Sequence, residues 1–95
     1  MTIAAKKTII YQYRLMVTDK VQDFEWPVDA SIIKVAQHHG DISMWVEQKE
    51  SNQDAYENRS FLVVPTGMAF PREPHYRYLD TVFDTRGSVW HVYEV

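Results

Sequence analysis

The strict alternation of side chains between Ile9 and Val17 constrains the fold of this chain more than any other feature. All the odd positions of this stretch are apolar or aromatic, whereas the even positions include Gln12 and Arg14. Successive side chains of a β-strand point to opposite faces, so a period of two over nine residues predicts a strand with one buried face. No segment shows a comparable helical period with capping residues, and a mainly β fold is expected.

A polar turn divides residues 31–48 into two β-prone runs. The turn is the tetrad 38–41, His-His-Gly-Asp, in which Gly40 can adopt the positive φ that many tight turns require. A helix over 32–38 is the alternative interpretation, but Gly40 comes too early for a helix of ordinary length. The segment therefore predicts a β-hairpin.

The last twenty residues, 76–95, show the same arrangement. Two alternating runs flank residues 84–87, Asp-Thr-Arg-Gly, and the glycine again suits a turn. His91 falls in the middle of the second run, where a period of two places it on the opposite face from Trp90 and Val92. We therefore expect a closing hairpin in which His91 is a partly buried strand residue, hydrogen-bonded within the sheet.

The remaining strands are expected to be short. Residues 24–28 alternate again, and because Pro27 donates no hydrogen bond, they predict a short or edge strand. Residues 61–64, Phe-Leu-Val-Val, form a continuous apolar run and predict a strand covered on both sides. The polar stretch 49–60 and the proline-rich stretch 65–75 are predicted to be loops.

Strand density and chain length together define the expected architecture. The 95 residues have room for one small domain, and the 45% that are hydrophobic suffice for a packed core. Short strands separated by turns at this density predict an all-β fold. We expect a single domain over 1–95, a compact antiparallel β-barrel or sandwich of about six to seven short strands with little or no helix.

The charge balance and the absence of cysteine narrow the possible functions. A formal charge of -3 argues against direct nucleic-acid binding, because no basic excess is present to displace counterions. Without cysteine the chain has no disulfide framework, thiolate zinc site or cysteine nucleophile. No apolar run approaches a membrane span, and the N-terminus does not resemble a signal peptide. We therefore expect no membrane association and a cytoplasmic location.

The histidines and carboxylates form no recognisable catalytic or metal-binding pattern. His38 and His39 are adjacent, and neighbours on a strand point to opposite faces, so we do not expect them to share a metal ion. No serine lies in a nucleophile-elbow motif. Acid–base chemistry by His91 with Asp80 or Asp84 is the enzymatic alternative. We expect no enzymatic activity, no cofactor and no metal site.

Aromatic side chains exceed what a core of this size requires, which favours a binding surface. Tyrosine, tryptophan, methionine and arginine are enriched at protein interfaces. The predicted partner-binding residues lie in one loop and the start of the next strand, and they are Met68, Phe70, Arg72, Tyr76, Arg77 and Tyr78. The alternative is that Phe70 and Tyr78 cap the core while the arginines are solvated.

A second candidate surface is acidic. It consists of Glu47, Glu50, Asp54 and Glu57, which fall in or beside the stretch 49–60. Such a patch could occupy a basic groove that normally holds nucleic acid. The alternative is a solvated polar loop.

Motifs across nearly the whole chain carry a family resemblance. The matching residues are Ala30, Ile32, Ile33, Val35, Gly40, Trp45, Thr66, Gly67, Tyr78, Thr81, Val89, Trp90, His91, Val92, Tyr93 and Glu94. This pattern resembles a family of small tailed-bacteriophage proteins of unknown function that end in V-W-H-V-[FY]-E. The family often has a histidine after Thr-Gly, where this chain has Met68, and a glutamine where it has His39. These departures argue further against histidine chemistry.

The resemblance implies a phage origin and supplies no activity or catalytic residue. Small phage proteins without enzyme motifs are similar, as a class, to stoichiometric inhibitors of host machinery. We therefore expect an accessory protein that binds a host bacterial protein, such as a CRISPR or other antiviral defence effector, in the host cytoplasm. One alternative is a homo-oligomer that sequesters a small nucleotide signal between aromatic side chains and Arg72, Arg77 or Arg86. A phage structural component is another.

Overall fold

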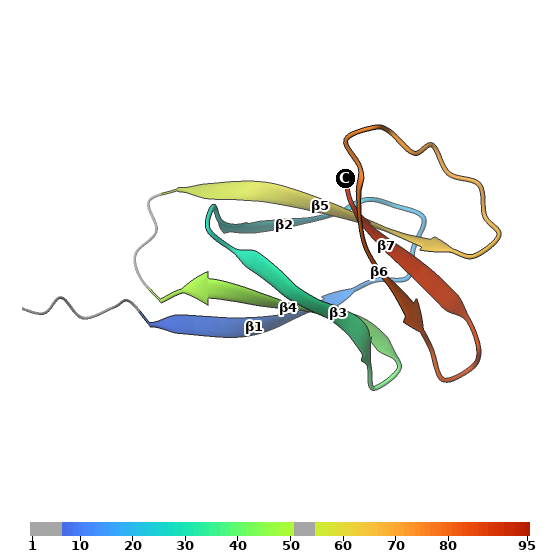
Figure 1. The fold of residues 1–95 in the computed structure, drawn as a ribbon, viewed down its shortest axis with the longest axis horizontal. Helices are drawn as coiled ribbons and strands as arrows, with labels where there is room; N and C mark the ends of the chain where they lie inside the picture. The colour runs from blue at the N-terminus through green and yellow to red at the C-terminus, as the bar shows by residue number, and fades with distance from the viewer. Residues whose placement is uncertain (1–6, 51–54) are drawn as a thin grey trace, which may run out of the picture.

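Seven β-strands in two sheets make up the described chain (Figure 1). The computed structural model describes residues 7–50 and 55–95. The strands are β1 (Thr8–Leu15), β2 (Gln22–Pro27), β3 (Ser31–His38), β4 (Asp41–Lys49), β5 (Tyr56–Pro65), β6 (Arg77–Phe83) and β7 (Val89–Glu94). This part of the chain has no helix that could cross a membrane. The prediction of an all-β fold is confirmed.

The two sheets have the strand orders β1-β4-β3 and β2-β5-β7-β6, and every pairing is antiparallel. Among the described strands no ladder joins one sheet to the other, so the fold is a sandwich and not a closed barrel. β2 is a six-residue strand at the edge of its sheet, as Pro27 predicted. β7 lies between β5 and β6, so the end of the chain is central to the second sheet.

The β3–β4 hairpin is confirmed, and the helix alternative for residues 32–38 is wrong. His38 pairs with Asp41, which leaves a two-residue loop of His39 and Gly40. Their φ angles are 52° and 85°, and two consecutive positive values are the mark of a type I′ turn. This turn matches the twist of the flanking strands, so Gly40 at its second position favours the hairpin.

The predicted loop over 49–60 is wrong for residues 56–60, and its residues 51–54 lie outside the described residues. β5 begins at Tyr56, so the predicted strand over 61–64 is only the second part of a ten-residue strand. The polar first part pairs with β2 along its length. A polar segment can form a strand when its backbone is paired and one side-chain face stays solvated.

The core lies between the two sheets and is built around aromatic rings. Tyr13 from the first sheet packs on Phe24 and Trp26 of β2, at ring-centroid distances of 5.5 and 5.1 Å. Phe61 of β5 contacts the same two β2 rings at 5.8 and 5.4 Å. Phe61 is fully buried, and full burial of such a side chain contributes roughly 1.5–3 kcal/mol. Met44 and Val92 are fully buried on opposite sheets and continue this core.

Candidate binding surface

The loop between β5 and β6 lines a cavity together with the second half of β5. Its start is fixed by backbone hydrogen bonds from Thr66 to Val89 (3.1 Å) and from Met68 to Pro65 (3.3 Å). Three of the predicted binding residues, Met68, Phe70 and Tyr76, line this cavity of about 530 Å³. We call the cavity and these three residues the loop surface.

Three of the predicted binding residues contact the ring of Tyr93 on β7. The Phe70 and Tyr78 ring centroids lie 5.2 and 5.7 Å from that of Tyr93, and the Arg72 guanidinium lies 5.3 Å from it. A guanidinium over an aromatic face is attracted by the negative ring face. Phe70 and Tyr78 therefore pack on Tyr93 rather than in the core cluster between the sheets.

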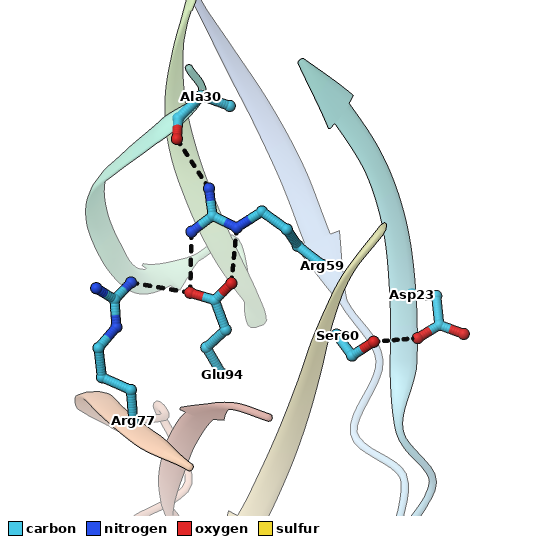
Figure 2. Close-up of polar contacts among 6 residues, drawn as sticks. All are labelled: Asp23, Ala30, Arg59, Ser60, Arg77 and Glu94. Atoms are coloured by element: carbon cyan, nitrogen blue, oxygen red, sulfur yellow. Dashed lines mark hydrogen bonds and ion pairs between the residues drawn. The ribbon is translucent and has the colours of Figure 1, made fainter. Parts of the chain in front are cut away.

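Arg77 is separated from that group and belongs to an ion-pair network at the end of β7 (Figure 2). Its Nη2 donates to Oε1 of Glu94 at 2.8 Å. Glu94 also accepts from Nε and Nη2 of Arg59, at 2.6 and 2.9 Å. Nη1 of Arg59 donates to the carbonyl of Ala30 at 2.8 Å, so the network connects the second sheet to the residue before β3.

Burial and pairing act on Glu94 in opposite directions, and pairing dominates. The hydrogen bond from Arg59 lowers the pKa of Glu94 most, burial raises it, and the charges of Arg59 and Arg77 lower it further. The net pKa of Glu94 is below its usual value. The same hydrogen bond raises the pKa of Arg59. Arg77, predicted to bind a partner, is thus already paired within the chain.

The described members of the predicted acidic patch come from both sheets, and Glu50 lines a pocket together with Tyr56, the residue before Glu57. Asp54 lies outside the described residues. Glu47 is half-buried on β4 in the first sheet, and Glu50 is exposed at the end of that strand. Glu57 lies on β5 in the second sheet, where its charge raises the pKa of Arg59. The described carboxylates are therefore divided between the two sheets.

His91 is held at both ring nitrogens by threonine hydroxyls. Its Nε2 lies 2.8 Å from Thr66 Oγ1, and its Nδ1 lies 3.0 Å from Thr81 Oγ1. Thr66 also donates to the Val89 carbonyl at 3.3 Å, and the Tyr78 hydroxyl is hydrogen-bonded to Thr81. The prediction of a partly buried, hydrogen-bonded strand histidine is confirmed. The Thr-Gly element thus supplies a hydroxyl that positions this imidazole.

Asp80 and Asp84 organise the backbone of the closing hairpin. Oδ1 of Asp80 accepts from the N–H of Thr81 at 2.8 Å. Oδ1 of Asp84 accepts from two N–H groups of the β6–β7 turn, at 2.8 and 2.9 Å. The hydrogen-bond partners of His91 are the threonines rather than these carboxylates.

His38 and His39 do not point apart, contrary to the expectation for strand neighbours. His39 is in the left-handed turn, and the two ring centroids lie 4.1 Å apart. His38 Nδ1 is 3.0 Å from Nε2 of Gln12, and its ring packs edge-on against Trp45. Within residues 7–50 and 55–95, no group of three or more His, Cys, Asp or Glu side chains is placed to hold a metal ion.

Several residues of the cavity were missed by the sequence reasoning. They are Val17 and Val21 from the loop between β1 and β2, Leu62 and Val64 from β5, and Trp90 from β7. Val17 was predicted on the buried face of the first strand, which is wrong, because β1 ends at Leu15 and Val17 is 51% exposed. The signal for Val21 was a single apolar residue within the polar stretch 18–23. The β1–β2 loop lies beside β5 because β2 pairs with β5, and this long-range pairing cannot be read from local sequence patterns.

Sequence comparison identifies a family for nearly the whole chain. A family model described as a domain of unknown function (DUF7352) matches residues 6–95. No curated protein and no solved structure matches the chain. The matched range includes all seven strands, the loop surface and the Arg59–Glu94 pair. The chain therefore belongs to the DUF7352 family of domains of unknown function.

Proposed function

We propose that this protein acts by stoichiometric binding of another protein through the loop surface. The observation that carries the proposal is the character of the cavity, which is lined mainly by apolar side chains, several of them exposed. Val17, Val21 and Met68 are each about half exposed at its rim. Clustered apolar side chains that remain in water are typical of interaction sites.

The partner we propose is a host bacterial protein, such as an antiviral defence effector, that is inhibited by being occluded. Support for this setting comes from the resemblance of the terminal motif to that of small tailed-bacteriophage proteins. Two motif residues belong to the same region of the molecule. Trp90 lines the cavity, and the ring of Tyr93 contacts Phe70 and Arg72.

A small nucleotide signal is the second candidate ligand, because the cavity volume falls in the range of small-molecule sites. A phosphate group needs cationic donors close by. Among the described lining residues, the charged one is the acidic Asp19. Arg72 stacks on Tyr93 and Arg77 is paired with Glu94. A protein partner therefore suits this lining better than a nucleotide.

The proposal is tested by capture from bacterial lysate with three forms of the tagged protein. Met68→Asp places a charge at the loop surface, where Met68 is 56% exposed. Ile33→Asp is the matched control, because Ile33 is 49% exposed in the other sheet. We expect one protein at near-stoichiometric yield with the wild type and Ile33→Asp, and its loss with Met68→Asp.

Equal capture by all three forms would contradict binding through the loop surface. Capture of nothing specific by the wild type, together with a defined oligomer in native mass spectrometry, would favour ligand sequestration or a structural role. Circular dichroism of each variant checks that the sandwich is retained.

A further inference from the structure

One side of the sandwich is open along the edges of β1 and β2. On the other side, β3 of the first sheet lies against β6 of the second. On the open side, Tyr13 of β1 packs on Phe24 and Trp26 of β2. β1 and β2 are end strands of their sheets, so each has an edge that no described strand covers. Figure 1 shows that these two strands run in opposite directions.

The free backbone groups of β1 belong to its even-numbered residues. The N–H of Glu50 donates to the carbonyl of Lys7 at 2.7 Å, which continues the β1–β4 ladder by one hydrogen-bonded pair. Backbone groups alternate in direction along a strand, so the odd residues bond to β4 and the even ones face outward. The outward residues are Thr8, Ile10, Gln12 and Arg14, and all four are exposed. The edge of β1 is therefore accessible to another strand.

The free backbone groups of β2 belong to its odd-numbered residues. The N–H of Val28 donates at 3.3 Å to the residue before β5, so the even residues bond to β5 and the odd ones face outward. Asp23 and Glu25 are exposed and offer both of their backbone groups. Pro27 has no N–H, and its carbonyl already accepts from Ala30 at 3.0 Å. β2 therefore has two residues available for pairing.

β1 differs from the other described end strands in having an unprotected edge. β3 and β6 each contain a register irregularity, and β2 is short and contains Pro27. Irregularities of this kind, proline and short length keep sheet edges from pairing with other chains. β1 pairs with β4 in one regular register over eight residues, and its Ile10 and Tyr11 are 54% and 45% exposed. A long, regular and partly apolar edge of this kind favours pairing with another chain.

We propose that this open side binds a second copy of the chain, in a two-fold dimer in which β1 of each copy pairs with β2 of the other. A two-fold axis between the sheets and parallel to the strands places β2 of one copy beside β1 of the other. The pairing is antiparallel, because β1 and β2 run in opposite directions. Each sheet then continues into the opposite sheet of the second copy. This inference goes beyond the proposed function and does not use the residues of the loop surface.

The packing of Tyr13 determines the register of the pairing. Its ring contacts both aromatic rings of β2, so Tyr13 lies at the level of residues 24–26 along the strand direction. A two-fold axis parallel to the strands keeps this level unchanged in the second copy. Gln12 then lies opposite Glu25 of the second copy, and Arg14 lies opposite its Asp23. Each of these pairs exchanges two backbone hydrogen bonds, so about four form between each β1 and β2.

The side chains along this pairing are complementary in charge. The outward residues of both strands alternate with core side chains, so Arg14, Asp23 and Glu25 lie on the outer faces of their sheets. These faces become continuous in the dimer, and opposite charges on paired strands stabilise the pairing. Arg14 lies 3.5 Å from Asp41, which leaves guanidinium donors free for a second carboxylate. Pairing of β1 with β1 would instead bring the two acidic β2 edges together.

Cross-linking tests the pairing directly, because the chain contains no cysteine. Gln12→Cys and Glu25→Cys in one chain should give a covalent dimer on mild oxidation, since the two positions lie opposite each other across the interface. Within one copy they lie on the outer faces of different sheets, too far apart for a disulfide. Gln12→Cys alone should remain uncross-linked. Cross-linking of that single variant would overturn the proposal, because it would indicate pairing of β1 with β1.

Charge reversal tests the predicted register. Arg14→Asp should raise the dissociation constant of the dimer by about tenfold or more, because it places like charges together at each end of the interface. Adding Asp23→Arg to the same chain should restore dimerisation. Lys34→Asp is the matched control and should dimerise like the wild type, because Lys34 is an exposed cation on β3, at the other edge of the sheet. Absence of rescue by the double reversal would contradict the register.

The wild type provides a test that needs no substitution. Amide hydrogen exchange at Gln12 should slow by about tenfold or more as the protein concentration is raised and the dimer forms, because β2 of the second copy covers that N–H. A wild type that sediments as a monomer at about 1 mM would overturn the proposal. Met68→Asp should dimerise like the wild type. Failure of the dimer is therefore distinguishable from failure of the proposed function, which the lysate capture tests separately.

Discussion

Arg59 and Glu94 form a bidentate ion pair that joins β5 to the last residue of β7, with N–O distances of 2.6 and 2.9 Å. Their side chains are only 13% and 17% exposed. Removal of either charge should therefore destabilise the fold, because the remaining ion would stay mostly buried, without hydration and without a partner.

Replacement of Glu94 by glutamine should be strongly destabilising. Two arginines, Arg59 and Arg77, would lose their shared charge partner, and loss of one member of a buried pair costs about 3–5 kcal/mol. For a domain of this size the melting temperature should fall by at least about 10 °C. Glu25→Gln is the control, because Glu25 is exposed on β2 and its change should cost less than about 0.5 kcal/mol. Similar melting temperatures for both variants would contradict this role of Glu94.

The stability contributed by Glu94 should depend on acid pH. Its pKa is lowered on folding from a usual value of 4.5, first by the hydrogen bond from Arg59. A lowered carboxyl pKa means that the unfolded chain binds the proton more tightly. The contribution is therefore present above about pH 4.5 and is lost as the pH falls through the folded pKa. The free energies of unfolding of the wild type and Glu94→Gln, measured with denaturant, should converge as the pH falls below about 4.5. A difference that stays constant with pH would contradict the link between the ionisation of Glu94 and stability.

The hydrogen bonds around His91 predict one tautomer of its neutral ring. Thr66 donates its hydroxyl hydrogen to Val89, so its oxygen accepts from Nε2–H, and Nδ1 accepts from Thr81. Nitrogen chemical shifts of the imidazole should therefore report the Nε2–H form. Thr66→Ser should keep this preference and Thr66→Val should weaken it, at a stability cost of about 1 kcal/mol. A neutral Nδ1–H ring in the wild type would show that the hydroxyls are oriented the other way.

Removal of residues 89–95 should prevent folding. The segment contains all of β7, which lies between β5 and β6 and buries Val92 completely. The truncated chain should show no cooperative thermal transition. Removal of Val95 alone is the control, because it deletes one backbone hydrogen bond, to Ser60, and should cost about 1 kcal/mol. A cooperative transition in the longer truncation would mean that the remaining strands suffice for a core.

The strands that could be predicted are those whose side chains alternate or whose turns carry glycine. The stretch from Ile9 and the two hairpins at Gly40 and Gly87 fall in this class, since local chemistry determines them. The polar first part of β5 could not be predicted, because residues 56–60 form a strand through pairing with β2 rather than through their own composition. Tertiary context overrides propensity at such positions.

The candidate site could be predicted only in part for a related reason. The sequence groups Met68, Phe70 and Tyr76 in one loop, and these three residues line one cavity. It did not separate Arg77 from that group, because the pairing of Arg77 with Glu94 depends on the register between β6 and β7, which places the two residues opposite each other. An irregularity between Tyr78 and Asp80 changes that register locally.

The most direct measurement is amide hydrogen exchange of the protein alone and in complex with the partner that it captures. Binding through the loop surface predicts protection concentrated in residues 62–76, with amide exchange in β3 and β4 unchanged. Protection confined to the parts of β4 and β5 around Glu47 and Glu57, with exchange in 62–76 unchanged, would contradict binding through the loop surface. It would indicate instead that the partner binds at the acidic side chains.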